Sequence, residues 1–413
     1  MKFNTQLLHG EGNHAGYHQA TLPPIFQSNA FEHSSAEKLE KIFQNKAPGF
    51  SYSRINNPTV DAFEKRVTIL EGGIGSVACS SGMAAIFNAI VNILETGDEI
   101  LSSASIFGGT IGLFQDLQAL GIKITYIEHL SKETIDANVN KHTKVIFGEV
   151  IGNPKLDVLN IKEVADAAHE HGIVCIIDNT VTTPFIVQPL SLGADIVIQS
   201  SSKYINGSSN SISGIITDGG KFDWNTDKYP QMKEYKKMGP YGYIAKLRNT
   251  LFRNTGACLS PTNAFLNYIG LETLGVRMEK ICSNAETLVE WLNQNEKIIK
   301  VQYPGLPDNP CYEIAKQQFR NGFGGLITIR LGTKEKAFTV FNALKIPLKV
   351  SNIGDTKTLV IHPSSTIYAH STEEERISAG VYDDLLRISV GLEDVDDLIE
   401  DFAQALNQIE KEN

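Results

Sequence analysis

Two short apolar runs in the middle of the chain most constrain its fold. They are Ile173-Val174-Cys175-Ile176-Ile177 and Ile196-Val197-Ile198, and each ends where polar residues begin, as a buried strand does. Helical spacing of apolar residues precedes them at residues 58–70 and 81–94. Strands that alternate with helices predict an α/β fold in which helices cover both faces of a mainly parallel sheet.

Composition changes divide the chain of 413 residues into three parts. Residues 1–57 mix Gly, His, Asn and Pro and have one helical stretch, near residues 35–44, so we expect an arm. Residues 58–256 hold the alternating pattern and are expected to form a large domain, with an inserted surface segment at residues 219–242. Residues 257–413 begin with helical patterns and are expected to form a smaller C-terminal α/β domain.

Charge and cysteine content exclude several classes of function. The net charge of -10 at pH 7 argues against a nucleic acid or an anionic membrane as a partner. We find neither a signal-peptide core nor an apolar run of membrane-spanning length, so we expect a cytoplasmic protein. The five cysteines lack the spacing of zinc ligands, and free thiols are expected rather than disulfides or a metal site.

Polar residues follow both apolar runs and give the first indication of function. Asp178 ends the first run, and Lys203 stands 25 residues further on, after the second. Because neighbouring parallel strands end at the same edge of a sheet, the carboxylate and the amine are expected to face one site. Pyridoxal phosphate chemistry requires this pair, since an acid keeps the pyridine nitrogen protonated and a lysine holds the aldehyde as a Schiff base.

Two weaker motifs fit a phosphate, and each also has an ordinary structural explanation. Ser81-Gly82-Met83 opens a helix whose N–H groups and dipole favour an anion, although many Ser-Gly caps bind nothing. Tyr52 and Arg54 are expected on one side of an extended segment, either as a phosphate clamp or as plain surface residues before an Asn-Pro turn.

Three further residues are candidates for contacts with a ring or a substrate. Phe107, beside two glycines, can stack on a planar ligand or belong to the core. Asn153 follows a buried strand at the same edge as Asp178, where its amide can bond a ring hydroxyl or form a turn before proline. Arg387 lies within an apolar strand and requires an anion, which a substrate carboxylate or an internal acid can supply equally.

One competing motif involves the same lysine. Ser200-Ser201-Ser202-Lys203 also matches the S-x-x-K pattern of serine acyl-enzymes, in which the serine is the nucleophile, the motif opens a helix and a K-T-G element accompanies it. This sequence has no K-T-G, and its lysine follows a strand. We therefore predict that the lysine binds a cofactor, and a serine hydrolase or a non-catalytic protein is the alternative from another class.

Taken in order, these elements resemble the Cys/Met-metabolism family of pyridoxal-phosphate-dependent enzymes over essentially the whole chain. The shared elements are Tyr-x-Arg-x-x-Asn-Pro-Thr at 52–59, Ser-Gly-Met at 81–83, Gly-Gly-Thr at 108–110, Asn-Pro at 153–154, Asp178 and Ser-x-Ser-Lys at 200–203. The resemblance implies the fold of aspartate aminotransferase, with a mainly parallel seven-stranded sheet in the large domain.

The resemblance also implies roles for the site residues. Lys203 binds the cofactor aldehyde, Asp178 bonds the pyridine nitrogen, and the phosphate is held by Gly82, Met83, Ser200 and Ser202. Tyr52 and Arg54, from the arm, reach the phosphate of a neighbouring subunit. A dimer is then the minimum catalytic unit, and a homotetramer is common in the family.

Within the family the chain resembles the O-acetylhomoserine sulfhydrylases. The segments that carry this likeness begin at Gly220, Asn352 and Gly380. Asn352 stands where cystathionine synthases and lyases typically have serine, and Lys357 where they have glutamate. The resemblance implies that Arg387 and Asn352 bind the substrate carboxylate.

The implied reaction is a γ-replacement. Acetate leaves Cγ of O-acetylhomoserine, and sulfide or a small thiol takes its place to give homocysteine or a thioether such as methionine. A methionine or cystathionine γ-lyase, or a cystathionine γ-synthase, is the alternative within the family, because motifs do not say whether water or a thiol completes the reaction.

Two positions depart from the family pattern. Phe107 replaces the usual tyrosine, a candidate proton donor, and Gly207-Ser208-Ser209 replaces Gly-His-Gly. The first change is tolerable for an acyl ester, because acetate, whose acid has a pKa of about 4 to 5, departs with little help from a general acid. The second change has no explanation in the sequence.

Overall fold

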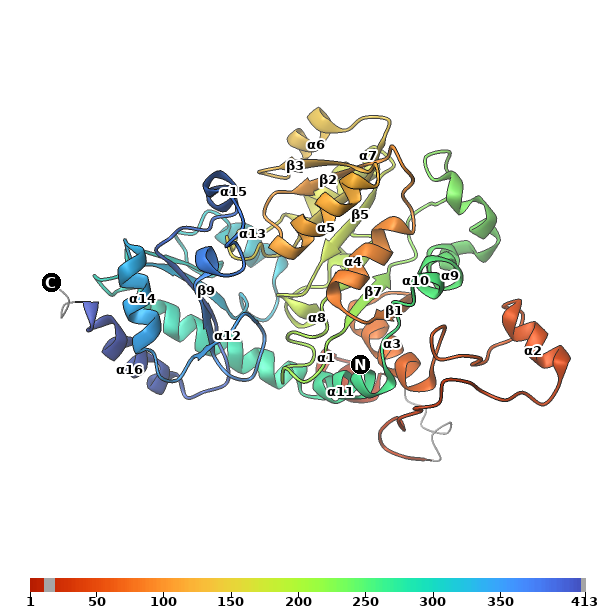
Figure 1. The fold of residues 1–413 in the computed structure, drawn as a ribbon, viewed down its shortest axis with the longest axis horizontal. Helices are drawn as coiled ribbons and strands as arrows, with labels where there is room; N and C mark the ends of the chain where they lie inside the picture. Colours follow the sequence, from red (N-terminus) through yellow and green to blue (C-terminus); the bar gives the residue numbers. More distant parts are fainter. Residues whose placement is uncertain (11–18, 410–413) are drawn as a thin grey trace.

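A computed structural model describes residues 1–10 and 19–409 and contains two sheets (Figure 1). The large sheet has seven strands in the order β1-β7-β6-β5-β4-β2-β3, and only β7 runs antiparallel to its neighbours. Its strands are β1 (Gly75–Cys79), β2 (Glu99–Ser103), β3 (Lys123–Ile127), β4 (Thr143–Glu149), β5 (Val174–Asp178), β6 (Ile196–Gln199) and β7 (Gly214–Asp218). The predicted mainly parallel seven-stranded sheet is confirmed.

The large sheet is buried on both faces. Side chains alternate along each strand, and successive residues enter two different cores. In β5, Val174 and Ile176 join one core while Cys175 and Ile177 join the other. The accompanying helices are α3 (Pro58–Glu71), α4 (Gly82–Val91), α5 (Gly108–Ala119), α6 (Lys132–Asn138), α7 (Ile161–Glu170), α8 (Thr183–Ile186), the 3-10 helix η2 (Pro189–Leu192), α9 (Gly242–Asn249), α10 (Leu251–Thr255) and α11 (Pro261–Glu272).

The second sheet has the strand order β10-β11-β12-β9-β8 and its own core. Its strands are β8 (Lys300–Gln302), β9 (Leu326–Arg330), β10 (Leu348–Lys349), β11 (Leu359–Ile361) and β12 (Leu385–Ser389). Helix α12 connects the two parts of the molecule, since it contacts α1 near the large sheet and α16 beside the second (Figure 1). The helices of this part are α12 (Leu274–Asn293), α13 (Tyr312–Gln318), α14 (Lys334–Ala343), η4 (Pro363–Ser365), α15 (Glu373–Ser378) and α16 (Val395–Leu406). The predicted smaller second α/β domain is confirmed, while its boundary at residue 257 stays a prediction.

The N-terminal arm differs from expectation in two places. It contains a helix that the sequence did not predict, α1 (Phe3–His9), as well as the expected one, α2 (Ala36–Phe43), which stands away from the body of the molecule (Figure 1). Tyr52 and Arg54 were expected in extended chain, but the chain turns after Tyr52, whose carbonyl accepts hydrogen bonds from Ile55 and Asn56. Residues 11–18 of the predicted arm and 410–413 of the predicted C-terminal domain lie outside the described residues.

The prediction that residues 219–242 lie at the surface is wrong for Trp224 and Tyr229, although most of the segment is exposed or half-buried. These two side chains are buried in the core on one face of the large sheet, and the 3-10 helix η3 (Pro230–Tyr241) follows them. The Tyr229 hydroxyl donates to the Lys144 carbonyl at 2.7 Å and accepts from the Val174 N–H at 3.0 Å. These aromatic residues therefore cover the ends of β4 and β5. No helix in the described part of the chain is both long and apolar enough to cross a membrane.

Candidate active site

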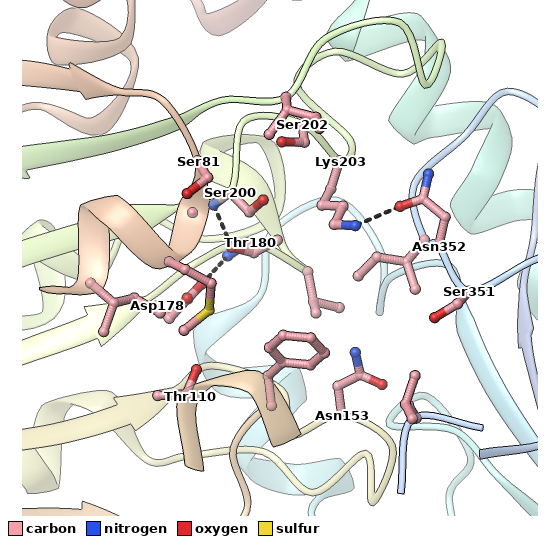
Figure 2. A pocket seen from close by; sticks show the side chains of 18 of the residues that line it. Ser81, Thr110, Asn153, Asp178, Thr180, Ser200, Ser202, Lys203, Ser351 and Asn352 are labelled. Atoms are coloured by element: carbon pink, nitrogen blue, oxygen red, sulfur yellow. Dashed lines mark hydrogen bonds between the residues drawn. The ribbon is translucent and has the colours of Figure 1, made fainter. Parts of the chain in front are cut away.

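The residues predicted from the sequence meet in one cavity of about 560 Å³ at the C-terminal edge of the large sheet (Figure 2). Its walls include eleven of the thirteen predicted site residues: Ser81, Gly82, Met83, Phe107, Asn153, Asp178, Ser200, Ser202, Lys203, Asn352 and Arg387. The other two, Tyr52 and Arg54, do not line it. The cavity therefore draws on segments from residue 81 to residue 387.

The acidic side of the cavity is formed by the ends of two neighbouring strands. Asp178 ends β5, and Glu149, its partner in the register, ends β4. Burial raises the pKa of Asp178 to about 6, although the hydrogen bond that it accepts from the Thr180 N–H at 2.8 Å acts to lower this pKa. Burial and the charge of Asp178 raise the pKa of Glu149, although the Phe107 N–H donates to it at 2.7 Å. Glu149 therefore holds a proton more firmly, and Asp178 is the anion near neutral pH.

Lys203 follows β6, which lies beside β5 in the sheet. Its Nζ donates a hydrogen bond to Oδ1 of Asn352 at 2.5 Å (Figure 2). Burial, and next the charge of Arg387, lower the pKa of the Lys203 amine. Such an amine loses its proton more readily than an exposed lysine does, so a larger fraction of it has the free lone pair that a nucleophile needs.

A cradle for an anion lies at the start of α4. Ser81 caps the helix by accepting from the Ala84 N–H at 3.0 Å, and the first N–H groups of a helix have no acceptor within it. A Cβ added to Gly82 would lie 2.7 Å from the Cβ of Ser200, so only glycine fits there. The Ser200 N–H donates to the Thr180 hydroxyl at 2.8 Å, which ties the cradle to the loop after Asp178 (Figure 2).

Ser202 lines the same cavity, but its hydroxyl is engaged within the protein. It donates to the Ser213 carbonyl at 2.9 Å and accepts from the Ser213 N–H at 2.8 Å. Thr110, by contrast, has a buried hydroxyl on the cavity wall for which the described residues offer no hydrogen-bond partner. A bound group with polar atoms would satisfy Thr110.

Arg387, on β12 of the second sheet, brings a buried cation to the cavity wall. It is 3% exposed, and its NH1 and NH2 groups donate to Asn153 Oδ1 at 2.9 Å and to the Asn352 carbonyl at 3.0 Å. Burial lowers its pKa to about 10, and its Nε has no partner among the described residues. Within the described residues no carboxylate forms an ion pair with Arg387, so the alternative of an internal acid as its partner finds no support. A buried cation still requires an anion.

Tyr52 and Arg54 are placed apart from this constellation. The Arg54 guanidinium lies 5.5 Å from the centre of the Tyr52 ring, and it donates to the Arg253 carbonyl. Tyr52 is 40% exposed. Their predicted contact with the phosphate of a neighbouring subunit stays a prediction.

Sequence reasoning missed seven polar residues that line the cavity: Thr110, Glu149, Thr180, Ser209, Asn210, Ser211 and Ser351. Two of them had a signal, since Glu149 ends a predicted strand and Thr180 follows Asp178 by two residues. Ser209 had only its place in the unexplained Gly207-Ser208-Ser209 departure, because its position at the cavity depends on the loop that carries Asn352, 143 residues away in sequence.

The residues present fit pyridoxal phosphate. The N–H groups at the start of α4, against which Gly82 lets Ser200 pack closely, suit the phosphate. The Asp178 carboxylate suits the pyridine nitrogen, and the Lys203 amine suits the aldehyde. The partnerless Thr110 hydroxyl adds a donor that the described protein alone leaves unused. The exposed ring of Phe107 lies on the same wall and can stack on a planar ring.

Comparisons with known proteins agree with this assignment. A family model described as Cys/Met metabolism PLP-dependent enzyme matches residues 4–407. The O-acetyl-L-homoserine sulfhydrylase of Corynebacterium glutamicum is 39% identical over 417 residues, which cover 97% of this chain and 95% of that protein. The homocysteine synthase of Schizosaccharomyces pombe is 37% identical over 419 residues, which cover 98% of this chain and 98% of that protein.

A solved structure extends the likeness to three dimensions. A protein of Campylobacter jejuni described as an O-acetylhomoserine (thiol)-lyase has a TM-score of 0.93 and 33% identity, with 98% of this chain and 100% of that chain covered. Its crystal structure contains N'-pyridoxyl-lysine-5'-monophosphate.

Proposed function

The chain belongs to the Cys/Met-metabolism family of pyridoxal-phosphate-dependent enzymes, and from this premise we propose that it is an O-acetylhomoserine sulfhydrylase. It exchanges the acetate on Cγ of O-acetylhomoserine for sulfide, or for a small thiol, and releases acetate with homocysteine or its thioether. The observation that carries the proposal is the meeting of Lys203, Asp178 and Arg387 in one cavity.

Each of these residues has a role in holding the reactants. Lys203 would hold the cofactor aldehyde, Asp178 would keep a proton on the pyridine nitrogen, and the start of α4 with Ser200 would hold the phosphate. Arg387 would bind the substrate carboxylate as the anion that its burial requires. Asn352 lines the cavity beside Arg387, which donates to its carbonyl, and would be a second contact for that carboxylate.

The chemistry follows from the position of one amine. When bound, pyridoxal phosphate withdraws electrons from Cα and Cβ of the substrate. Lys203, once the substrate amine has replaced it, takes and returns the protons at these two carbons. Its lowered pKa favours the neutral amine that this work requires.

Phe107 favours the ester over a thioether as the substrate. Its ring faces the cavity where a phenol is usual in the family, so this position supplies no proton to a leaving group. Acetate leaves as the anion of an acid with a pKa of about 4 to 5, whereas a thiol, with a pKa of about 8.5, leaves poorly unless it is protonated. Phe107 therefore supports γ-replacement of an acyl ester over elimination of a thiol by a γ-lyase.

We also propose that the enzyme is cytoplasmic and works as a homo-oligomer, with a dimer as the minimum and a tetramer as the full assembly. All five cysteines are free thiols, which fits a reducing compartment. The arm carries exposed apolar side chains such as Leu39 and Phe43, and it holds Tyr52 and Arg54 away from the cavity of their own chain. An arm of this kind supports a contribution to a second subunit.

One product measurement tests the function. The purified holoenzyme is incubated with O-acetylhomoserine, with and without sulfide, and homocysteine and 2-oxobutyrate are quantified. We expect homocysteine that depends on sulfide and little oxoacid. Oxobutyrate as the main product in the presence of sulfide would instead identify a γ-lyase. If neither O-acetylhomoserine nor sulfide is consumed, the proposed function is wrong. A Lys203→Ala variant serves as the inactive control.

A further inference from the structure

Ser209 lies at the mouth of the cavity in a conformation that needs support. Its φ of 54° is in the left-handed region, which is unfavourable for a residue with a side chain. Hydrogen bonds hold it on two sides: its hydroxyl donates to Oδ2 of Asp355, and it accepts from Nδ2 of Asn352 at 2.9 Å. The serine that departs from the Gly-His-Gly pattern of the family is thus part of a chain of polar contacts that ends at Lys203.

The direction of each hydrogen bond in this chain is fixed by Asp355. Asp355 is 3% exposed, and its Oδ1 accepts from the backbone N–H of Lys357 at 2.9 Å and from the ammonium of Lys357 at 2.7 Å. Burial opposes ionisation, but the hydrogen bonds from Lys357 and Ser209 outweigh it and lower the pKa of Asp355. An ionised carboxylate only accepts hydrogen bonds.

It follows that the Ser209 hydroxyl must use its proton on Asp355 and can offer only a lone pair to its other neighbour. Asn352 must then present its NH₂ group to Ser209, which turns Oδ1 towards Nζ of Lys203, 2.5 Å away. The orientation of this amide is therefore not free. It follows from the charge on Asp355, which neither lines the cavity nor contacts Lys203.

The backbone around Asn352 is held as well. Its carbonyl accepts from Arg387 at 3.0 Å, and the Thr356 N–H donates to the Gly207 carbonyl at 2.9 Å. These two bonds join the Asn352 loop to the substrate-facing arginine and to the segment after Lys203. Only the side-chain amide of Asn352 is left to be oriented, and Ser209 does this.

We propose that Ser209, supported by Asp355, is a positioning residue that orients the Asn352 amide so that Asn352 accepts a hydrogen bond from the freed amine of Lys203. The proposal rests on the proposed function, in which that amine takes the proton from Cα. In the reverse orientation Nδ2 would donate to the lone pair of the amine and occupy the electrons that the proton transfer needs. The correct orientation holds the amine by one of its own N–H bonds and leaves the lone pair to the substrate.

Steady-state kinetics of three variants of the holoenzyme test the role. Ser209→Ala removes the hydroxyl, Ser209→Gly removes it and also relieves the left-handed conformation, and Ser208→Ala makes the same change at an exposed neighbour outside the cavity. We expect both Ser209 variants to lose about 3- to 10-fold in kcat, since one hydrogen bond is lost and water can partly replace an exposed hydroxyl. KM for O-acetylhomoserine changes less than about twofold because Arg387 is untouched, and Ser208→Ala matches the parent enzyme.

A second measurement needs no substrate and so separates this proposal from the proposed function. In the cofactor-free, full-length chain, the pKa of Lys203 is obtained from the pH dependence of its acylation by acetic anhydride, followed by mass spectrometry. Loss of the Oδ1 acceptor removes a bond that favours the ammonium, so we expect a pKa lower by about half to one unit in both Ser209 variants and unchanged in Ser208→Ala. An unchanged pKa, or parent-like kcat in Ser209→Gly, would show that the hydroxyl does not position the amine.

Discussion

The two ends of the cavity are built in different ways: the end around Asp178, where we propose that the cofactor ring binds (the cofactor end), and the end around Arg387, where we propose that the substrate carboxylate binds (the substrate end). At the cofactor end, Asp178, Thr180 and Ser200 belong to successive strand ends of one sheet and bond one another over at most 20 residues of sequence. At the substrate end, Arg387 bonds Asn153 across 234 residues and brings the second sheet against the first. The cofactor end therefore needs one sheet, and the substrate end needs both sheets in place.

The two ends also bury charges of opposite sign. Burial raises the pKa of Asp178 to about 6 and lowers the pKa of Arg387 to about 10, so each charge is held at a cost in the cofactor-free chain. A cationic ring at one end and an anionic carboxylate at the other would relieve both costs. The buried charges of the cavity therefore suit a cofactor and a substrate, and they do not serve the stability of the protein alone. Variants of Asp178 and Arg387 test the two ends separately.

The largest expected effect is at the cofactor end. Asp178→Asn keeps an acceptor for the Thr180 N–H but removes the anion that faces the ring nitrogen. We expect kcat to fall by about 10²- to 10³-fold, the usual effect of losing one electrostatic contact in a transition state, with little change in KM. A change in KM alone would mean that Asp178 contacts the substrate and not the cofactor ring. The assignment of separate cofactor and substrate ends would then be wrong.

The same variant has an opposite effect on stability. Because the pKa of Asp178 is raised, the folded chain holds its proton more tightly than the unfolded chain, and the cost of ionisation appears as pH rises from about 4 to about 6. In the cofactor-free protein we expect Asp178→Asn to be more stable by roughly 3 kcal/mol at pH 7 to 8 and nearly equal to the parent near pH 4. Urea midpoints at both pH values check this, and a loss of stability at pH 8 would contradict it.

A smaller effect, of a different kind, is expected at the substrate end. Arg387→Lys keeps a positive charge but loses the planar group that can bind a carboxylate in two places. We expect KM for O-acetylhomoserine to rise by about 10- to 100-fold, with a smaller change in kcat. Arg330→Lys on the neighbouring strand β9, where the side chain pairs with Asp384 outside the cavity, is the matched control and leaves KM unchanged. If Arg387→Lys lowered kcat and spared KM, the arginine would not be the carboxylate site.

The sequence predicted the cofactor end more fully than the substrate end for a physical reason. Strand ends and helix starts are local signals: Pro58 begins α3 where expected, Asn57 caps it, and Gly72 ends it with a φ of 73°. The same kind of signal placed Asp178 and Lys203 at one edge. The bond between Lys203 and Asn352 joins residues 149 positions apart, so no local pattern announces it.

Two errors in the predicted fold have the same origin. Helix α1 buries only Leu7 among its own residues and is held by Arg66, which donates to the Leu7 carbonyl, so its pattern alone is too weak to predict it. The segment around Trp224 is polar in composition, yet its rings pack on one another and on Tyr243, with Trp224 stacked 5.3 Å from that ring. Composition shows neither contact, because each depends on a partner elsewhere in the chain.

The smallest expected effect concerns Phe107, which lies between the two ends. Phe107→Tyr adds a phenol where the leaving group departs, and the Phe107 N–H bond to Glu149 is kept because it is a backbone bond. Acetate needs no proton, so we expect turnover of O-acetylhomoserine with sulfide to change less than about threefold. A thiol leaving group does need one, so the slow release of methanethiol and 2-oxobutyrate from methionine should rise by about 10-fold or more. Phe107→Leu, which lacks the phenol, should show no such gain. A tenfold loss with the ester, or an equal gain in the leucine variant, would mean that the ring at this position does not select the leaving group and that specificity arises at the substrate end alone.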